Sequence, residues 1–153
     1  MNETLTIVAA VLAGLFAGLF VTFAYAVMPG LRRADDSTFA HAMREINVAI
    51  LGPMLALIFG GGTIASIAAA VVGYDDEGAR WWLVAGAVLV VAAGVVTMGL
   101  NVPLNSQLEA GVTAGEAPAS VRQAFEDPWV RWNIVRSVLS TAGFVALLAA
   151  LVA

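Results

Sequence analysis

The side chains that could do chemistry in this sequence are few, and most lie inside or beside long apolar segments. The polar residues of this kind are Asn47, Asn101, Asn105, Asn133 and Arg136. Close to them in the sequence lie His41, Glu45, Trp129 and Trp132. A polar group in hydrocarbon costs free energy unless it is paired, so these side chains should turn toward one another. Their convergence, rather than any single residue, predicts a site.

Helical spacing brings several of these residues onto shared faces. His41 and Glu45 are separated by one helical turn. Asn101 and Asn105 have the same spacing, provided that the helix continues through Pro103. Side chains at positions i and i+4 are neighbours on a helix surface. The sequence therefore predicts two pairs of polar side chains, each on a single helix face.

Arg136 is the most demanding of these residues, since it cannot lose its charge to escape the cost of burial. It must extend to the membrane surface, pair with a carboxylate such as Glu45, or face a hydrated pocket. Asn133 lies one turn before it, and Trp129 and Trp132 lie in the preceding turns. This segment is the centre of the predicted site.

A structural interpretation competes with the functional one at each position. Asn101 and Asn105 could hold two helices together instead of binding a ligand. Trp129 and Trp132 are also typical of the aromatic belt at a membrane interface. A histidine on a loop helix, such as His41, is more often solvated than catalytic.

The composition limits the chemistry further. There is no cysteine, which excludes disulfides, thiol catalysis and thiolate metal sites. All seven basic residues are arginines, so no lysine can form a Schiff base. His41 is the single histidine, and a multi-histidine metal site would need several protomers. We predict no metal site, and a net charge of −4 without a basic cluster argues against a nucleic-acid partner.

The elements that must position these residues are membrane-spanning helices. Hydrophobic residues make up 61% of the chain and charged residues 12%, against about 45–50% and about 25% in soluble domains. A span needs roughly 20 apolar residues. Segments that meet this requirement lie at about 5–28, 47–72, 81–100 and 134–153. We predict an all-α fold, a single domain of four transmembrane helices in the lipid bilayer.

The arginines predict the orientation of this bundle. Six of the seven lie between the first and second spans or around the start of the fourth, whereas the connection 73–80 has one arginine and three acidic residues. Because positive residues favour the cytoplasmic side, loops one and three should face the cytoplasm and both termini the outside. The predicted location is the plasma membrane.

Each of the two predicted cytoplasmic loops should contain a short amphipathic helix. In loop one it begins at about Ser37 and runs into the second span. In loop three, Gly111 and Gly115 should break the chain, and a short helix should start at Pro118. Asp127-Pro128 is typical of a helix start, so the fourth helix should begin there.

Small residues should mediate helix packing. Gly14 and Gly18 form a GxxxG pattern in the first span, which allows a close helix contact within the bundle or between protomers of a homo-oligomer. Pro53 and the glycines 60–62 could bend the second span.

Several short motifs resemble one known family. They are Met28-Pro29-Gly30-Leu31 after the first span, Phe39 with residues 43–47, Asn101-Val102-Pro103-Leu104-Asn105 after the third, and Trp129 with Trp132-Asn133 and Arg136. In this order they resemble the anthrone oxygenase-like membrane proteins, a largely uncharacterised family of four-helix proteins. The resemblance extends over nearly the whole chain.

The resemblance implies an oxygenase that converts an anthrone to an anthraquinone with molecular oxygen and without a recognised cofactor. Such an enzyme needs a base, an oxyanion stabiliser and an apolar slot. On this hypothesis His41 or Glu45 is the base, and Arg136 is the catalytic oxyanion stabiliser, assisted by Asn101, Asn105 and Asn133. The ligand is further held by the amides and rings of Asn47, Asn101, Asn105, Trp129, Trp132 and Asn133.

Two other functions compete with this one. A non-catalytic membrane protein could use the same site to bind a lipid, quinone or other hydrophobic molecule, or could assist a partner complex. A small transporter fits less well, because four helices without a charged midplane offer no ion pathway in a monomer.

Overall fold

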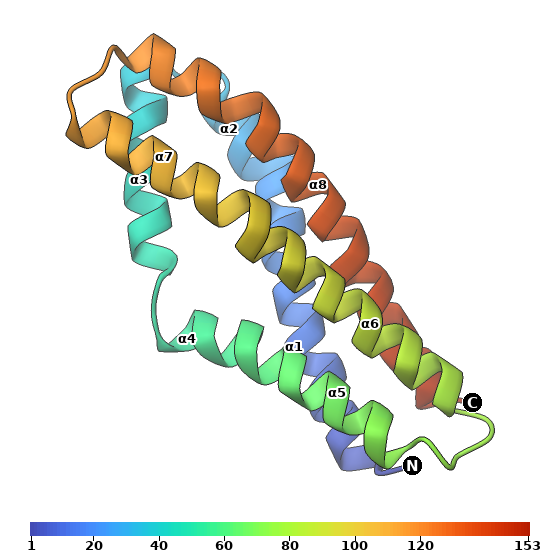
Figure 1. The fold of residues 1–153 in the computed structure, drawn as a ribbon. Helices are drawn as coiled ribbons and strands as arrows, with labels where there is room; N and C mark the ends of the chain where they lie inside the picture. The colour runs from blue at the N-terminus through green and yellow to red at the C-terminus, as the bar shows by residue number, and fades with distance from the viewer.

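A computed structural model describes residues 1–153 and consists of helices and their connections, without strands. Four continuous helical stretches are long and apolar enough to cross a membrane: Glu3–Leu31, Pro53–Val72, Arg80–Thr113 and Pro118–Ala150. Figure 1 shows them as an elongated bundle with both chain termini at the same end. The prediction of an all-α fold with four membrane-spanning helices is confirmed, and the chain is a multi-pass membrane protein.

Several of these stretches change helix type along their length, with π-helical turns (η) between α-helical segments. The first two stretches and the helix between them comprise α1 (Glu3–Thr22), η1 (Phe23–Val27), α2 (Met28–Leu31), α3 (Asp36–Ile50), α4 (Pro53–Leu55), η2 (Ala56–Gly61) and α5 (Gly62–Val72). The last two comprise α6 (Arg80–Val96), η3 (Thr97–Asn101), α7 (Val102–Thr113) and α8 (Pro118–Ala150).

Two of the π-helical turns lie just before a proline. Pro29 follows η1 and Pro103 follows η3, each at the start of the next α-helical segment. Proline lacks an N–H, and its ring clashes with the carbonyl four residues earlier, which here lies inside the π turn. The wider hydrogen-bonding pattern of a π turn absorbs this defect, so the helix continues. Asn101 and Asn105 therefore belong to one continuous helical stretch.

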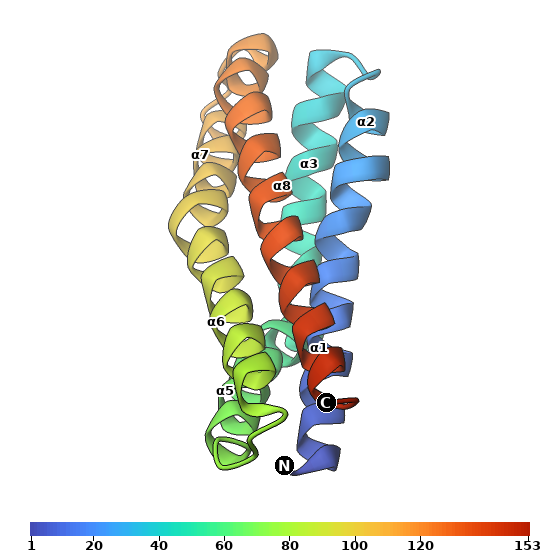
Figure 2. The same ribbon diagram turned by 90° about the vertical axis from the view of Figure 1, so that its right-hand side faces the viewer.

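The bundle changes composition along its length. At the end that carries the termini, α8 packs against α6 and α1, and α5 packs between α1 and α6. At the opposite end, α3 packs against α7 and α8, as Figure 2 shows. We call this second end, with the connections 32–35 and 114–117, the arginine-rich end. The position of α5 at one end of the bundle is thus taken by α3 at the other.

The break between α3 and α4 differs from the continuous second span expected over 47–72. α3 ends at Ile50, and a new helix begins at Pro53. A residue before proline is pushed toward extended backbone, and Gly52 has φ −168° and ψ −179°. The expectation that the loop-one helix runs into the second span is therefore wrong, and residues 47–50 belong to α3.

Loop three also differs from expectation. α7 runs through Gly111, where a Cβ would lie 2.9 Å from Val121 Cγ2, so this glycine allows α7 to approach α8. The turn comes at Gly115, which has φ +70°. α8 continues through Pro128 instead of starting there. The helix tolerates this proline because the carbonyl that it leaves without an N–H belongs to Ala124, an exposed residue that water can reach.

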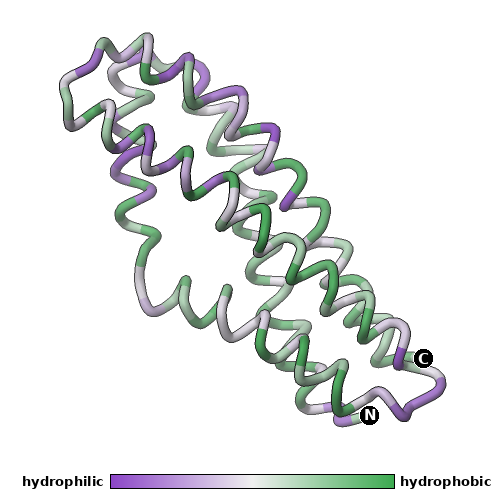
Figure 3. The backbone as a smooth tube through the Cα atoms, in the orientation of Figure 1, coloured by the Kyte–Doolittle hydropathy of each residue, from purple (hydrophilic) through white to green (hydrophobic).

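The packing of the bundle differs between its two ends. Near the termini the core is built largely from alanines of α1, α5 and α8 around Leu83, Val90 and Leu147. α6 and α8 cross closely there, since a Cβ on Gly86 would lie 2.8 Å from Leu147 Cγ. Large side chains fill the core at the arginine-rich end, including Phe39, Met43 and Trp129. Figure 3 shows hydrophilic residues gathered toward this end.

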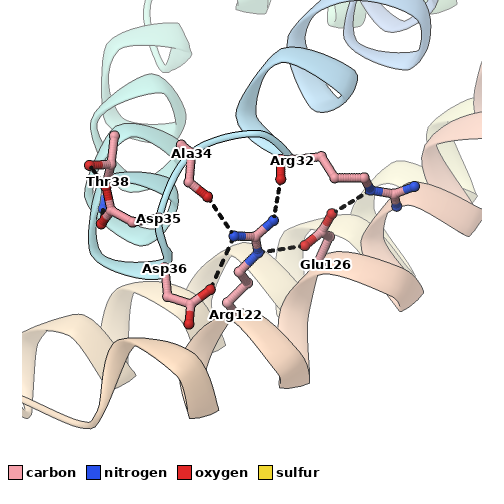
Figure 4. A network of polar contacts seen from close by, with 7 residues as sticks. All are labelled: Arg32, Ala34, Asp35, Asp36, Thr38, Arg122 and Glu126. Carbon is pink, nitrogen blue, oxygen red and sulfur yellow. Dashed lines mark hydrogen bonds and ion pairs between the residues drawn. The ribbon is translucent and has the colours of Figure 1, made fainter.

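Ionic contacts tie loop one to α8 at the arginine-rich end (Figure 4). Arg122 donates to Asp36 Oδ1 at 3.1 Å, to Glu126 Oε2 at 2.7 Å, and to the carbonyls of Ala34 and Arg32 at 2.9 and 3.0 Å. Arg32 also donates to Glu126 at 2.8 Å, and this hydrogen bond, with the charge of Glu126, raises the pKa of Arg32. These contacts fix the start of α3 against α8.

Candidate functional site

A cluster of buried polar side chains lies in the core at the level of η1 and η3. We call it the buried polar cluster, and its members are Asn101, Asn105, Trp129, Asn133 and Arg136. Asn101 and Asn133 are 0% exposed and Arg136 is 5% exposed. A continuous series of direct contacts links the five residues. η3, α7 and α8 thus bring together five of the nine residues for which convergence was predicted. The other four lie outside the cluster: Asn47, His41, Glu45 and Trp132.

Arg136 is a buried cation without an anion. Its Nε and Nη2 donate to Asn133 Oδ1 at 3.1 and 3.0 Å. Its guanidinium carbon lies 3.8 Å from the ring centroid of Phe20 and 5.0 Å from that of Trp129. Arg136 takes part in none of the ion pairs of the molecule. Glu45, considered as its partner, instead pairs with Arg44 at 2.7 Å.

Asn133 holds this cation in place. Its Oδ1 accepts both hydrogen bonds from Arg136, and its Nδ2 donates to the carbonyl of Phe20 at 3.2 Å. That carbonyl lies next to η1, so Asn133 also joins α8 to the first span. With both ends of its amide engaged, Asn133 positions Arg136 and has little capacity left for a ligand.

Trp129 connects the cluster to the aromatic side chains of the core. Its Nε1 donates to Asn105 Oδ1 at 2.7 Å, and its ring packs on Phe23 and Phe125 with centroids 5.5 and 5.8 Å apart. Trp129 is 1% exposed. It therefore belongs to the core, and the interpretation as an interfacial belt residue does not apply to it.

Asn101 has an unsatisfied acceptor. Its Nδ2 donates to the carbonyl of Trp129 at 3.3 Å, while its Oδ1 is buried and has no hydrogen-bond partner. Asn47, which is half-buried on α3, has an unsatisfied donor, its buried Nδ2. Buried polar atoms are nearly always hydrogen-bonded in native proteins, so each of these two atoms calls for a partner.

The other predicted residues lie outside these contacts. His41 is exposed, and its Nδ1 lies 2.8 Å from the carbonyl of Ser37 in its own helix. Glu45 is also exposed and is engaged with Arg44. Trp132 is half-buried, and no aromatic or cation–π contact links it to the cluster. The cluster consequently contains no carboxylate and no imidazole.

An apolar groove of about 450 Å³ runs along the first span beside the cluster. It separates α1 and η1 from α3 and is lined by Leu19, Thr22, Phe23, Val27, Ile46, Ala49 and Ile50. Phe23 connects the two features, because it lines the groove and its ring packs on Trp129. Sequence reasoning missed Phe20 and Phe23, since a phenylalanine within an apolar span carries no signal of its own.

The groups that the cluster offers to a ligand are hydrogen-bond donors of Arg136, the acceptor Asn101 Oδ1, and aromatic faces. No set of three or more histidine and acidic side chains gathers anywhere in the molecule to hold a metal ion. The arrangement suits a planar ligand that carries a negative charge on oxygen, because guanidinium is attracted to oxyanions and the rings provide an apolar contact.

A family model described as anthrone oxygenase matches residues 39–146, which include all five members of the buried polar cluster. No curated protein matches the chain, and no solved structure does.

Proposed function

This chain belongs to the anthrone oxygenase family, and from that premise we propose that the buried polar cluster binds the enolate of an anthrone-like polycyclic aromatic and promotes its oxidation by molecular oxygen. The observation that carries the proposal is the uncompensated charge of Arg136. A buried cation is costly unless an anion accompanies it, and an anionic ligand supplies that anion.

The reaction needs a carbon acid and dioxygen. Loss of one proton from the methylene carbon of the anthrone gives an enolate, whose charge rests largely on oxygen. The enolate transfers one electron to O₂, and the carbon radical and superoxide then combine to form a C–O bond. Cleavage of the O–O bond, with loss of the second methylene proton, gives the quinone carbonyl and water. One O₂ is consumed for each quinone and each water formed.

In this reaction the chain's residues act mainly by electrostatics. Arg136 stabilises the enolate oxygen, which lowers the pKa of the bound carbon acid. Asn133 orients Arg136, and Trp129 packs against the rings of the ligand. Because the cluster contains neither a carboxylate nor an imidazole, the proposal assigns no base to His41 or Glu45. Water or hydroxide accepts the proton once the enolate is stabilised.

The apolar groove is a second observation in favour of a hydrophobic ligand. Six of its seven lining residues are hydrophobic. Phe23 is the side chain between the groove and Trp129. An uncharged anthrone dissolved in the bilayer would reach the groove without crossing water, and rotation of Phe23 would bring it to Trp129, whose ring lies beside Arg136.

The test is oxygen uptake by the purified protein in lipid nanodiscs with anthrone as substrate. We expect uptake above the uncatalysed rate, with anthraquinone formed in equal molar amount. Arg136→Leu should reduce the enzymatic rate at least a hundredfold, in line with the loss of an oxyanion stabiliser. Arg131→Leu is the matched control, because Arg131 is exposed on the same helix. Equal rates in the two variants would contradict the proposal.

A second candidate is a non-catalytic protein that binds an anionic amphiphile or a quinol. The absence of a general base among the contacts of Arg136 favours it. The same experiment separates the two functions. A binding protein would retain anthrone in an Arg136-dependent manner and leave the rate of oxygen uptake unchanged.

A further inference from the structure

The amide of Asn101 is oriented by its contacts. Its Nδ2 must face the carbonyl of Trp129, 3.3 Å away, because only the nitrogen can donate to a carbonyl oxygen. Oδ1 therefore points elsewhere, and there it has no partner although Asn101 is 0% exposed. The free group at this position is an acceptor. Asn101 cannot stabilise an oxyanion with this oxygen, in contrast to the role expected from the family resemblance.

We propose that Asn101 is a specificity-determining residue whose Oδ1 accepts a hydrogen bond from a neutral hydroxyl group of the ligand. The favoured ligands are then polycyclic aromatics that carry at least one ring hydroxyl besides the oxygen that Arg136 binds. This proposal deepens the proposed function and rests on it, because it concerns the same ligand in the same cluster.

The cluster contains both kinds of group that such a ligand requires. Arg136 offers donors to an ionised oxygen, and Asn101 offers an acceptor to a protonated one. Asn105 Oδ1 and Asn133 Oδ1 are already engaged, by Trp129 and Arg136 respectively. Asn101 is thus the one asparagine of the cluster whose side-chain oxygen is buried without any hydrogen-bond partner.

Asn47 provides a useful contrast. Its unsatisfied atom is a donor, Nδ2. A donor binds a hydroxyl oxygen and an ether oxygen alike, whereas an acceptor binds only the hydroxyl. Discrimination between a hydroxyl and its methyl ether should therefore depend on Asn101 and not on Asn47.

The experiment measures binding without turnover. Monohydroxyanthrone isomers, each paired with its own methyl ether, are titrated under argon into protein in nanodiscs, and binding is followed by tryptophan fluorescence. For at least one isomer, the natural protein should bind the hydroxyl compound roughly tenfold more tightly than the ether. Asn101→Leu should bring this ratio close to one, and Asn47→Leu should leave it unchanged.

Other outcomes decide against the proposal. If Asn101 Oδ1 only binds an internal water, Asn101→Leu should weaken all ligands equally and leave every ratio as it was, which overturns the proposal. Should Asn101→Leu fail to fold, Asn101→Ala replaces it: the acceptor is again removed, so the preference for the hydroxyl should be lost, and its persistence would overturn the proposal. Because no oxygen is present, these results stand apart from those of the oxygen-uptake test.

Discussion

Arg136 and Asn133 show how a charge can be kept inside an apolar bundle. The guanidinium lies against the ring faces of Phe20 and Trp129, which attract cations, and it donates two hydrogen bonds to one amide oxygen. These contacts orient the cation and leave its charge uncompensated. The resulting site is complementary to an anion before any ligand arrives.

The first prediction concerns this uncompensated charge. Asn133→Asp places a carboxylate about 3 Å from Arg136, at the position of the present amide oxygen. The ion pair should offset the lost hydrogen bond to the Phe20 carbonyl, so thermal stability should change little. Affinity for the anthrone enolate should fall at least tenfold, because the variant supplies its own anion. Isothermal titration calorimetry measures the affinity, and thermal unfolding in nanodiscs measures the stability.

Asn133→Leu is the informative comparison. It leaves Arg136 buried without its acceptor, which should lower the free energy of unfolding by about 2–4 kcal/mol. If Asn133→Asp bound the enolate as tightly as the natural protein, the charge of Arg136 would not be what attracts the ligand.

At the scale of elements, the π-helical turns lie where the first and third spans contact the part of the cluster on α8. Asn101 lies at the end of η3 and donates to α8, and Asn133 of α8 donates to the carbonyl of Phe20 beside η1. A π turn adds a residue to one turn of a helix and so rotates everything that follows it. The positions of Pro29 and Pro103 thereby determine which faces of the first and third spans meet the site.

The second prediction tests this role of proline. Pro103→Ala restores an N–H and removes the clash, so the third span can return to a regular α-helix without loss of stability. Asn101 should then rotate away from the Trp129 carbonyl, and affinity for the ligand should fall. Ligand titration together with chemical unfolding tests both effects. Unchanged ligand affinity in a folded variant would show instead that the π turn is not caused by the proline.

The limits of sequence reasoning are also visible at this scale. Apolar length was enough to identify the four spanning helices, and the cost of a buried Arg136 was enough to predict that Asn101, Asn105 and Asn133 gather with it. Helical spacing could not show which way α3 faces. Packing of Phe39 and Met43 into the core turns His41 and Glu45 outward, a tertiary effect that local spacing does not contain.

The continuity of the helices was equally hard to predict. Pro53 ends the helix before it, whereas Pro29, Pro103 and Pro128 lie within continuous helical stretches. The outcome depends on whether a π turn or exposed backbone can absorb the missing hydrogen bond. That condition depends on neighbouring elements, so residue type alone does not decide it.

At the scale of the whole molecule, the two ends of the bundle differ in packing and composition. The terminal end consists of closely packed helices with small residues at their contacts, as is usual in membranes. The arginine-rich end contains the aromatic core, the cluster and the groove. The break at residues 51–52 separates α3 from α4 and α5. Arg122 compensates for this break, because its contacts with Asp36 and the Ala34 carbonyl hold α3 against α8.

The third prediction concerns the terminal end. Gly86→Val should lower the free energy of unfolding by about 1–3 kcal/mol, since its side chain would meet Leu147 and the Gly143 carbonyl. Gly18→Val is the matched control, because a Cβ there has open space around it. Unfolding in mixed micelles measures the stability of both variants.

The Gly18 variant also tests the GxxxG pattern. A smaller oligomer in this variant would place Gly18 between protomers, whereas Gly14 already contacts Phe144 within the chain.

The most direct test of an anion-binding Arg136 is a measurement of the ionisation state of bound anthrone. Under argon, the absorption spectrum distinguishes the neutral ligand from its enolate, and a pH titration gives the apparent pKa of the bound molecule. With the natural protein in nanodiscs we expect this pKa to lie at least about one unit below the value in empty nanodiscs, equivalent to about 1.4 kcal/mol of anion stabilisation. Arg136→Leu should abolish the shift. An unshifted pKa with the natural protein, or an equal shift in the variant, would contradict the claim that a buried, unpaired arginine holds the ligand as an anion.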